Sequence, residues 1–403
     1  MIIELKKLSI YLYFFTFCSV FFNQFTLYIS TRISLPFRYL EVLVFILLVF
    51  FYFLSFLKKE NIETSISRFS IFSWFILVFF GNLLVNLNTA IEGNSYIFIS
   101  SFIFIHSLVI IYFFTNLTDF DELKKLSIFL IKFHIILSLI FYLFYVIGIN
   151  QIALGVHDPQ DNWPRARGFF AEPSHYSIFA WISFMYFFFI EKENKVFLFL
   201  SFIAFVLSIA STGYIFAFLN ILLIIFFRNL KYLFYFIPFG VFIILLIPEN
   251  YLVRDVLRVY EEVLFLAEFA SNQNWQNFDY TNGSRVILFI RQFSYLDLNI
   301  ISILFGLGPG GQAIILNSLQ DIFNGPIYLI AEFGLISFIF FLYFFSVIFK
   351  RTNNDFKPLL LAYLFISFFN PPGGNFGIDF IFIYYLIFII SETKVLSHEE
   401  HKI

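Results

Sequence analysis

The chain has 403 residues, of which 60% are hydrophobic, 24% aromatic and only 13% charged, and 68 of them are phenylalanine. A soluble domain is nearer half apolar and a quarter charged, so this composition excludes an ordinary cytoplasmic enzyme and also intrinsic disorder. The formal net charge of −2 does not indicate nucleic-acid binding, and the single cysteine, Cys18, excludes an intrachain disulfide and a cysteine-based metal cluster.

Long apolar runs divide the chain. A run of about 20 apolar residues can span a bilayer as a helix. Because these runs lack strict alternation, they favour helices over a β-barrel. Twelve spans are predicted, at 8–29, 37–57, 69–86, 96–115, 126–148, 169–190, 195–211, 213–227, 230–247, 326–349, 358–370 and 376–391. We therefore expect an all-α polytopic membrane protein in which residues 1–403 form a single transmembrane domain.

The basic residues predict the orientation of the spans. With both termini in the cytoplasm, all 14 lysines fall on or near the inner side, as the positive-inside rule requires. The outer basic residues are all arginine: Arg32, Arg38, Arg165, Arg167, Arg254, Arg258, Arg285 and Arg291. Arginine offers a planar fork that grips phosphate or carboxylate, so this bias favours an anion site on the outer face. The alternative is chance combined with snorkelling of long side chains at the interface.

The first of two long outer loops, 149–168, is rich in Gly, Pro, Asn and Asp, which predicts a series of turns. Arg165 and Arg167 are two residues apart near its end. If that piece is extended, both guanidinium groups project to one side. We therefore expect the pair at the mouth of the helical bundle.

A helix is predicted to open directly after this loop. Pro173 suits the first helical position, and Glu172 lies where the helix dipole favours a carboxylate. The alternatives for Glu172 are a favourable helix start and a carboxylate that accepts a proton. His175 is the second candidate base. Together with His157 it makes only a weak case for a metal, so no metal site is expected.

The second long outer loop, 248–325, begins with an amphipathic pattern over 251–268, which predicts a helix lying on the outer membrane surface. Arg254 and Arg258 share one face of it, although Arg258 could instead pair locally with Glu262. The polar, aromatic stretch after it suits sugar binding and equally suits an ordinary surface loop.

Glycines and ionisable residues follow in the same loop. The turn Gly306–Gly311 could bring backbone amides close to a phosphate. Glu332 lies within the tenth predicted span, where it is either a functional group or a carboxylate hydrogen-bonded to a neighbouring helix. The predicted substrate-binding residues in the two outer loops are Arg254, Arg258, Arg291, Trp163, Trp275, Tyr280, Gly308, Asp321 and Asn324.

Three sequence patches carry a family resemblance. The segment Arg165–Ser174, RARGFFAEPS, resembles the signature that precedes a span in the O-antigen polymerase family, the Wzy-type enzymes. Ser211-Thr-Gly213 is similar to another position of that family. Gly306–Gly310 with Asn324–Gly334 resembles a later signature shared with the O-antigen ligases. The ligases often carry a His-Asn pair where this chain has Phe323-Asn324, which favours polymerase over ligase.

The resemblance implies a membrane glycosyltransferase with a helical bundle of the GT-C type, working at the outer face of the cell inner (cytoplasmic) membrane. Donor and acceptor would be oligosaccharide repeat units on undecaprenyl pyrophosphate, without metal or nucleotide, and a chain-length regulator is an implied partner. In this chemistry Arg165, Arg167 and Arg285 would stabilise the pyrophosphate leaving group, and Glu172 or His175 would take the acceptor proton.

Two other functions remain open at this stage. An O-antigen ligase or related lipid-linked glycan transferase would use the same arginine chemistry with a different acceptor. A transporter of the lipid-linked oligosaccharide would need charged residues at mid-depth, where the predicted spans hold few: Lys132, Glu332 and Asp379. Most of the arginines lie on the predicted outer side of the membrane, which favours an enzyme with its site on that side.

Overall fold

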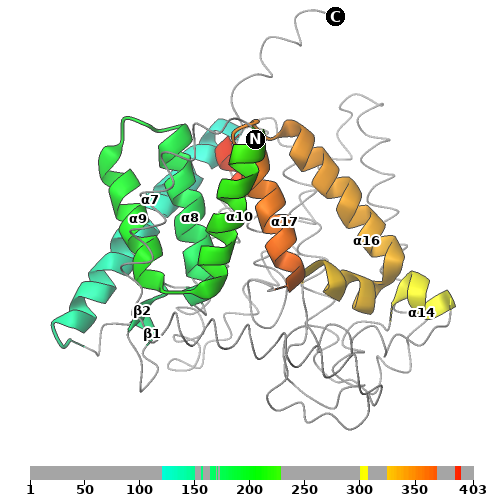
Figure 1. Ribbon diagram of the computed structural model, residues 1–403, viewed down its shortest axis with the longest axis horizontal. Coiled ribbons are helices and arrows are strands. Elements are labelled where there is room, and N and C mark those ends of the chain that lie inside the picture. Colours follow the sequence, from blue (N-terminus) through cyan, green and yellow to red (C-terminus); the bar gives the residue numbers. More distant parts are fainter. Residues whose placement is uncertain are drawn as a thin grey trace, which may run out of the picture.

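The computed structural model describes residues 120–149, 156–157, 164–168, 170, 173–227, 300–306, 325–369 and 386–391. This part of the chain is helical apart from one short strand pair (Figure 1). In chain order its elements are α7 (Phe120–Val146), β1 (Val156–His157), β2 (Arg165–Ala166), α8 (Pro173–Phe189), α9 (Lys195–Ser208), α10 (Ser211–Phe227), α14 (Ile300–Phe305), α16 (Gly325–Arg351) and α17 (Lys357–Phe369). Residues 386–391 are also helical.

The helices coincide with predicted apolar runs. Helices occupy the runs at 126–148, 169–190, 195–211, 213–227, 326–349 and 358–370. The runs at 8–29, 37–57, 69–86, 96–115 and 230–247, and most of 376–391, lie outside the described residues. Within the described part, length and composition single out one helical stretch that could cross a membrane, Lys124–Val146. The bundle of twelve spans with both termini in the cytoplasm therefore stays a prediction.

Described helices that are joined by short connections run antiparallel. Figure 1 shows the connection between α8 and α9 and the connection between α16 and α17 at one end. The β1–β2 pair and the turn between α9 and α10 lie at the opposite end. Short connections between consecutive apolar helices give this antiparallel arrangement. It puts the arginine-bearing strand β2 and the lysine-bearing connection at 190–194 at opposite ends of the described bundle.

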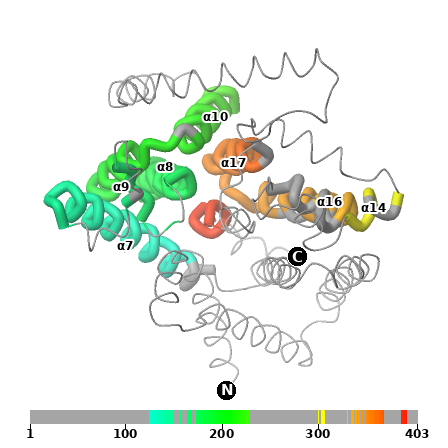
Figure 2. The backbone as a smooth tube through the Cα atoms, turned by 90° about the horizontal axis from the view of Figure 1, so that it is seen from below, coloured from blue at the N-terminus to red at the C-terminus, as the bar shows by residue number. Residues whose placement is uncertain are grey.

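Helix α8 is central to the described bundle. Its residues are buried from His175 to Phe187, and Figure 2 shows it among α7, α9 and α10. Trp181 joins three helices, because its ring centroid lies 5.1 Å from that of Phe205 on α9 and its Nε1 donates a 3.1 Å hydrogen bond to Asn220 Oδ1 on α10. An indole buried with its N–H paired both packs and fixes orientation. The first turn of α8 is thus held on a rigid helix.

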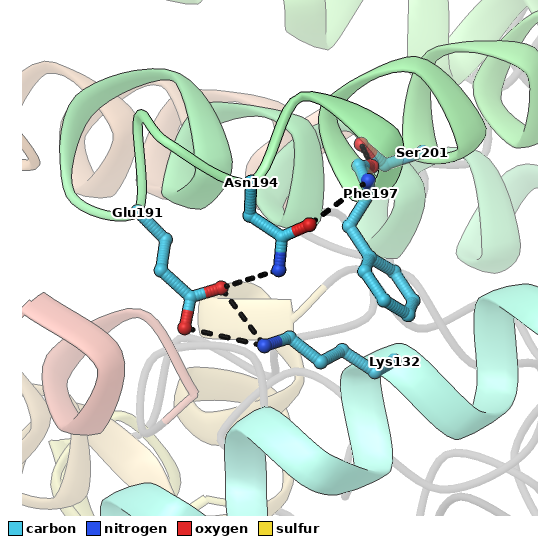
Figure 3. A network of polar contacts seen from close by, with 5 residues as sticks. All are labelled: Lys132, Glu191, Asn194, Phe197 and Ser201. Atoms are coloured by element: carbon cyan, nitrogen blue, oxygen red, sulfur yellow. Dashed lines mark hydrogen bonds and ion pairs between the residues drawn. The ribbon is translucent and has the colours of Figure 1, made fainter.

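A polar network ties α7 to the connection between α8 and α9 (Figure 3). Lys132 Nζ lies 2.9 Å from Glu191 Oε2, and Asn194 Nδ2 donates to the same carboxylate oxygen at 3.2 Å. The Asn194 side chain also accepts from the Phe197 backbone N–H at 3.4 Å, which caps α9. The Lys132 ammonium lies 5.4 Å from the Phe197 ring centroid. Lys132, a charge within a predicted span, is therefore neutralised at the end of the bundle remote from β2.

Lys132→Met is expected to lower the free energy of unfolding by about 1–2 kcal/mol, between the values for exposed and buried ion pairs. The two side chains are 26% and 35% exposed, so the substitution leaves a half-buried carboxylate without its cation. Thermal unfolding of the purified full-length chain measures the effect. Lys192→Met, at an exposed neighbour in the same connection, is the control and should change little. Equal effects of the two substitutions would show that the network contributes nothing specific.

Candidate functional site

The arginine pair lies on a short extended segment, Pro164–Gly168, which we call the arginine arm. Arg165 and Ala166 form β2, antiparallel to β1, with His157 opposite Arg165 and Val156 opposite Ala166. Ala166 is fully buried, whereas Arg165 and Arg167 are half-buried. Successive side chains of an extended segment point to opposite sides. This burial pattern agrees with the prediction that the two arginines share one side, with Ala166 packed into the bundle on the other.

Burial changes the electrostatics of Arg167. Partial removal from water lowers the pKa of the Arg167 guanidinium, because desolvation penalises its charged form. Arginine starts from so high a pKa that the group remains protonated at neutral pH. A charge in such a partly desolvated position interacts more strongly with an anion than the same charge in water. The partial burial of Arg167 is therefore compatible with the predicted anion site, which stays a prediction.

The end of α7 nearest the arm supplies a row of polar side chains that the sequence analysis did not single out. His134, Ser138 and Tyr142 are spaced four residues apart, so they share one face of the helix, and all three are buried. Three polar residues at this spacing, in the part of α7 that follows Lys132 and is otherwise apolar, were the signal available in the sequence. Each member of this α7 polar row contacts the arginine arm or the first turns of α8.

His175, the second candidate base, lies in the first turn of α8 and is 3% exposed. It therefore meets an acceptor hydroxyl only if the acceptor enters between the helices. His157 lies in β1 and Glu332 lies in α16. Of the predicted site residues, the structure brings together Arg165 and Arg167.

The remaining predicted site residues lie outside the described residues. These are Glu172, Arg285, Arg254, Arg258, Arg291, Trp163, Trp275, Tyr280, Gly308, Asp321 and Asn324. The described residues hold no group of three or more His, Cys, Asp or Glu side chains arranged to bind a metal ion. The metal-free site therefore stays a prediction.

Two of the sequence patches meet at the start of α8. Gly213, in the first turn of α10, packs so closely on Ser177 that a Cβ atom there would overlap the Ser177 side chain. The Ser177 hydroxyl donates a 2.6 Å hydrogen bond to the Ser174 carbonyl. Glycine at position 213 thus permits the close approach of α10 to α8. The Ser-Thr-Gly patch supports the helix end that follows the arginine arm.

Close backbone packing also occurs beside two glycines of the later signature, Gly306 and Gly334. Gly334 breaks α16, with φ 79° and ψ 177°, and a Cβ there would overlap the Leu304 carbonyl of α14. Gly306, which ends α14, has a φ of 80° that suits glycine at a helix C-terminus. Gly306 and Gly334, one from each half of that signature, therefore both lie where α14 meets the bend in α16.

Comparisons of the chain with protein-family models, with curated proteins and with solved structures found no match.

Proposed function

We propose that the chain is a polysaccharide polymerase, a glycosyltransferase that joins oligosaccharide repeat units carried on undecaprenyl pyrophosphate at the outer face of the cytoplasmic membrane. The observation that carries the proposal is the arginine arm: two half-buried arginines flank a fully buried alanine, and Arg167 is partly desolvated. Fixed guanidinium groups of this kind stabilise a phosphate leaving group without a metal.

The proposed reaction transfers the growing glycan from its lipid carrier to the next repeat unit. A hydroxyl oxygen of the acceptor forms a bond to the anomeric carbon of the donor while the bond from that carbon to the pyrophosphate oxygen breaks. Undecaprenyl pyrophosphate leaves with the bonding electrons, and Arg165 and Arg167, with Arg285, bind the negative charge that develops on it. The hydroxyl proton passes to a base, for which Glu172 is the first candidate and His175 the second.

The positions of charged residues support a one-sided enzyme over a transporter. A transporter for a charged lipid-linked sugar needs polar groups along a path through the bundle. Lys132, one of the few charges within the predicted spans, pairs with Glu191 at the end of the bundle remote from the arm. That pairing gives Lys132 a role in packing.

The test is deletion of the coding region in its host, complemented with wild type, Arg165→Ala, Arg285→Ala or Glu172→Ala, with surface glycan separated on a gel. Loss of the long ladder, with single repeat units still attached to the surface, is the result expected of a polymerase. Lys192→Ala, at an exposed position remote from the arm, should restore the full ladder.

Other outcomes of that experiment separate the alternatives. Loss of all surface glycan, with finished polymer accumulating on undecaprenyl pyrophosphate, would identify a ligase. Repeat units trapped on the cytoplasmic side would identify a transporter and overturn the enzyme proposal. Full ladders from all three alanine variants would reject the assigned residues.

A further inference from the structure

The arginine arm is attached to the bundle at both of its ends. At the first end, the Tyr142 hydroxyl donates a 3.3 Å hydrogen bond to the carbonyl of Pro164, the residue before Arg165. At the second end, Gly168 packs on His134 and Tyr176. The two arginines lie between these points, and the pairing of Ala166 with Val156 adds a third attachment in the middle.

Gly168 fits its place only because it has no side chain. Its φ is +56°, in the left-handed region, and the Phe170 N–H donates a 3.0 Å hydrogen bond to the Arg167 carbonyl across the turn. A Cβ at position 168 would lie 2.9 Å from His134 Cδ2, would overlap Nε2 of the same ring, and would lie 3.2 Å from Tyr176 Cε2. The imidazole of His134 thus sets how deep the end of the arm lies in the bundle.

The surfaces that Gly168 contacts are themselves held in place. The His134 ring lies 5.2 Å from the Phe170 ring and 5.2 Å from the Phe179 ring, measured between centroids. Ser138 and Tyr176 share a hydrogen bond between their hydroxyl groups, and the Ser138 hydroxyl also donates to the Ile135 carbonyl at 2.9 Å. Buried hydrogen bonds of this kind fix side-chain rotamers. The α7 polar row therefore forms a rigid surface against the arm.

We infer that His134, Ser138 and Tyr142 are positioning residues that hold Arg165 and Arg167 in the geometry needed for the departing phosphate. The inference rests on the proposed function, since it takes the arm to be the anion site. Groups that stabilise a developing charge act best when they are fixed beforehand, because they need not reorganise during the reaction. A displacement of about 1 Å can cost a large factor in rate.

The first test separates kcat from KM for the full-length chain in membranes, with undecaprenyl-pyrophosphate-linked repeat units as substrate. Tyr142→Phe and Ser138→Ala each remove one hydroxyl, and we expect each to lower kcat per folded molecule about tenfold with little change in KM. Ground-state binding of a long lipid-linked substrate is shared among many groups, whereas the leaving-group charge appears only in the transition state.

The matched controls remove one tyrosine hydroxyl and one serine hydroxyl at positions away from the arginine arm. The Tyr214 hydroxyl donates a 3.1 Å hydrogen bond to the Val206 carbonyl, and the Ser183 hydroxyl donates 2.8 Å to the Phe179 carbonyl. The acceptors of these two hydrogen bonds belong neither to the arginine arm nor to the α7 polar row. Tyr214→Phe and Ser183→Ala should therefore leave kcat unchanged. An equal fall in kcat for variants and controls would overturn the inference.

A second test measures the accessibility of the arginine arm by chemical labelling and does not depend on catalysis. Because Cys18 is the only cysteine, Cys18→Ser with Arg165→Cys gives a chain with a single thiol on the arm. We expect Ser138→Ala or Tyr142→Phe to raise the rate of labelling by a membrane-impermeant maleimide at least about threefold, since a half-buried position becomes more accessible as the arm loosens. Ser183→Ala should not change that rate.

The outcomes of the two tests distinguish failure of the positioning role from failure of the proposed function. Unchanged labelling in both variants would overturn the positioning role while leaving the polymerase proposal intact. Faster labelling in a chain whose wild type makes no polymer would reject the proposed function while supporting the attachment of the arm to α7.

Discussion

Arg167→Lys is expected to leave about one hundredth of the wild-type rate of glycan polymerisation, which is the size of loss seen when one preorganised donor to a developing oxyanion is removed. Lysine keeps a positive charge but replaces the planar fork with a single ammonium, so two parallel hydrogen bonds to phosphate are lost. The rate is measured as the growth of the ladder in membranes that contain equal amounts of wild type or variant.

The residual activity of this variant should also depend on pH. Burial lowers the pKa of Arg167. Desolvation acts on a lysine in the same direction, and lysine begins near 10.4, well below arginine. The protonated form binds the leaving group, so raising the pH removes the charge from lysine before it affects arginine. The ratio of the variant rate to the wild-type rate is therefore expected to fall as the pH is raised toward the pKa of the lysine, which burial lowers from its usual value of about 10.4.

A matched control for Arg167→Lys lies at another half-buried arginine. Arg351, at the C-terminal end of α16, holds its guanidinium carbon 5.2 Å from the Phe388 ring centroid. Arg351→Lys makes the same chemical change remote from the arm and should leave the ladder unchanged. Equal losses from the two substitutions, or a variant-to-wild-type ratio that does not vary with pH, would contradict the leaving-group role of Arg167.

The sequence predicts the described helices well and their ends less well. The apolar run at 169–190 alone would start the helix too early, whereas the prediction of Pro173 at the first helical position is confirmed, because α8 begins there. The chain first turns at Gly168 in a left-handed conformation, which hydropathy does not register. In the same way the run at 195–211 includes the turn after α9, which ends at Ser208 before Ile209 adopts a φ of 41°. Apolar content locates a helix, whereas backbone turns decide where it ends.

For the candidate site, too, the sequence predicts some features and misses others. The two-residue spacing of Arg165 and Arg167 put both on one side only if the segment is extended, and the structure has Arg165 in a strand. The polar side chains that hold the arm were not predicted, because their partners are distant in sequence: Tyr142 bonds to the residue 22 positions later, and Ser138 to Tyr176, 38 positions later. Likewise Glu191, the partner of Lys132, is 59 residues away. Spacing along one helix is visible in a sequence, but contacts between helices are not.

Gly334→Ala is expected to destabilise the folded chain by at least about 3 kcal/mol, since it adds steric overlap to backbone strain. The residue has φ 79° and ψ 177°, a conformation that is essentially restricted to glycine. A Cβ atom there would also overlap the Leu304 carbonyl and lie 2.5 Å from the Phe305 nitrogen. Because these atoms belong to the backbone of α14, a change of side-chain rotamer cannot relieve the overlap.

Gly148→Ala is the matched control for this substitution. Gly148 follows α7 with a φ of +84°, and among the residues that the structure describes no atom lies within 4 Å of the place a Cβ would take. Its replacement therefore adds strain without overlap, which should cost about 1 kcal/mol. Thermal unfolding of the two purified full-length variants measures the difference. Equal losses of stability would show that α14 does not pack on the bend of α16, whereas a larger loss at position 334 supports the close contact between α14 and that bend.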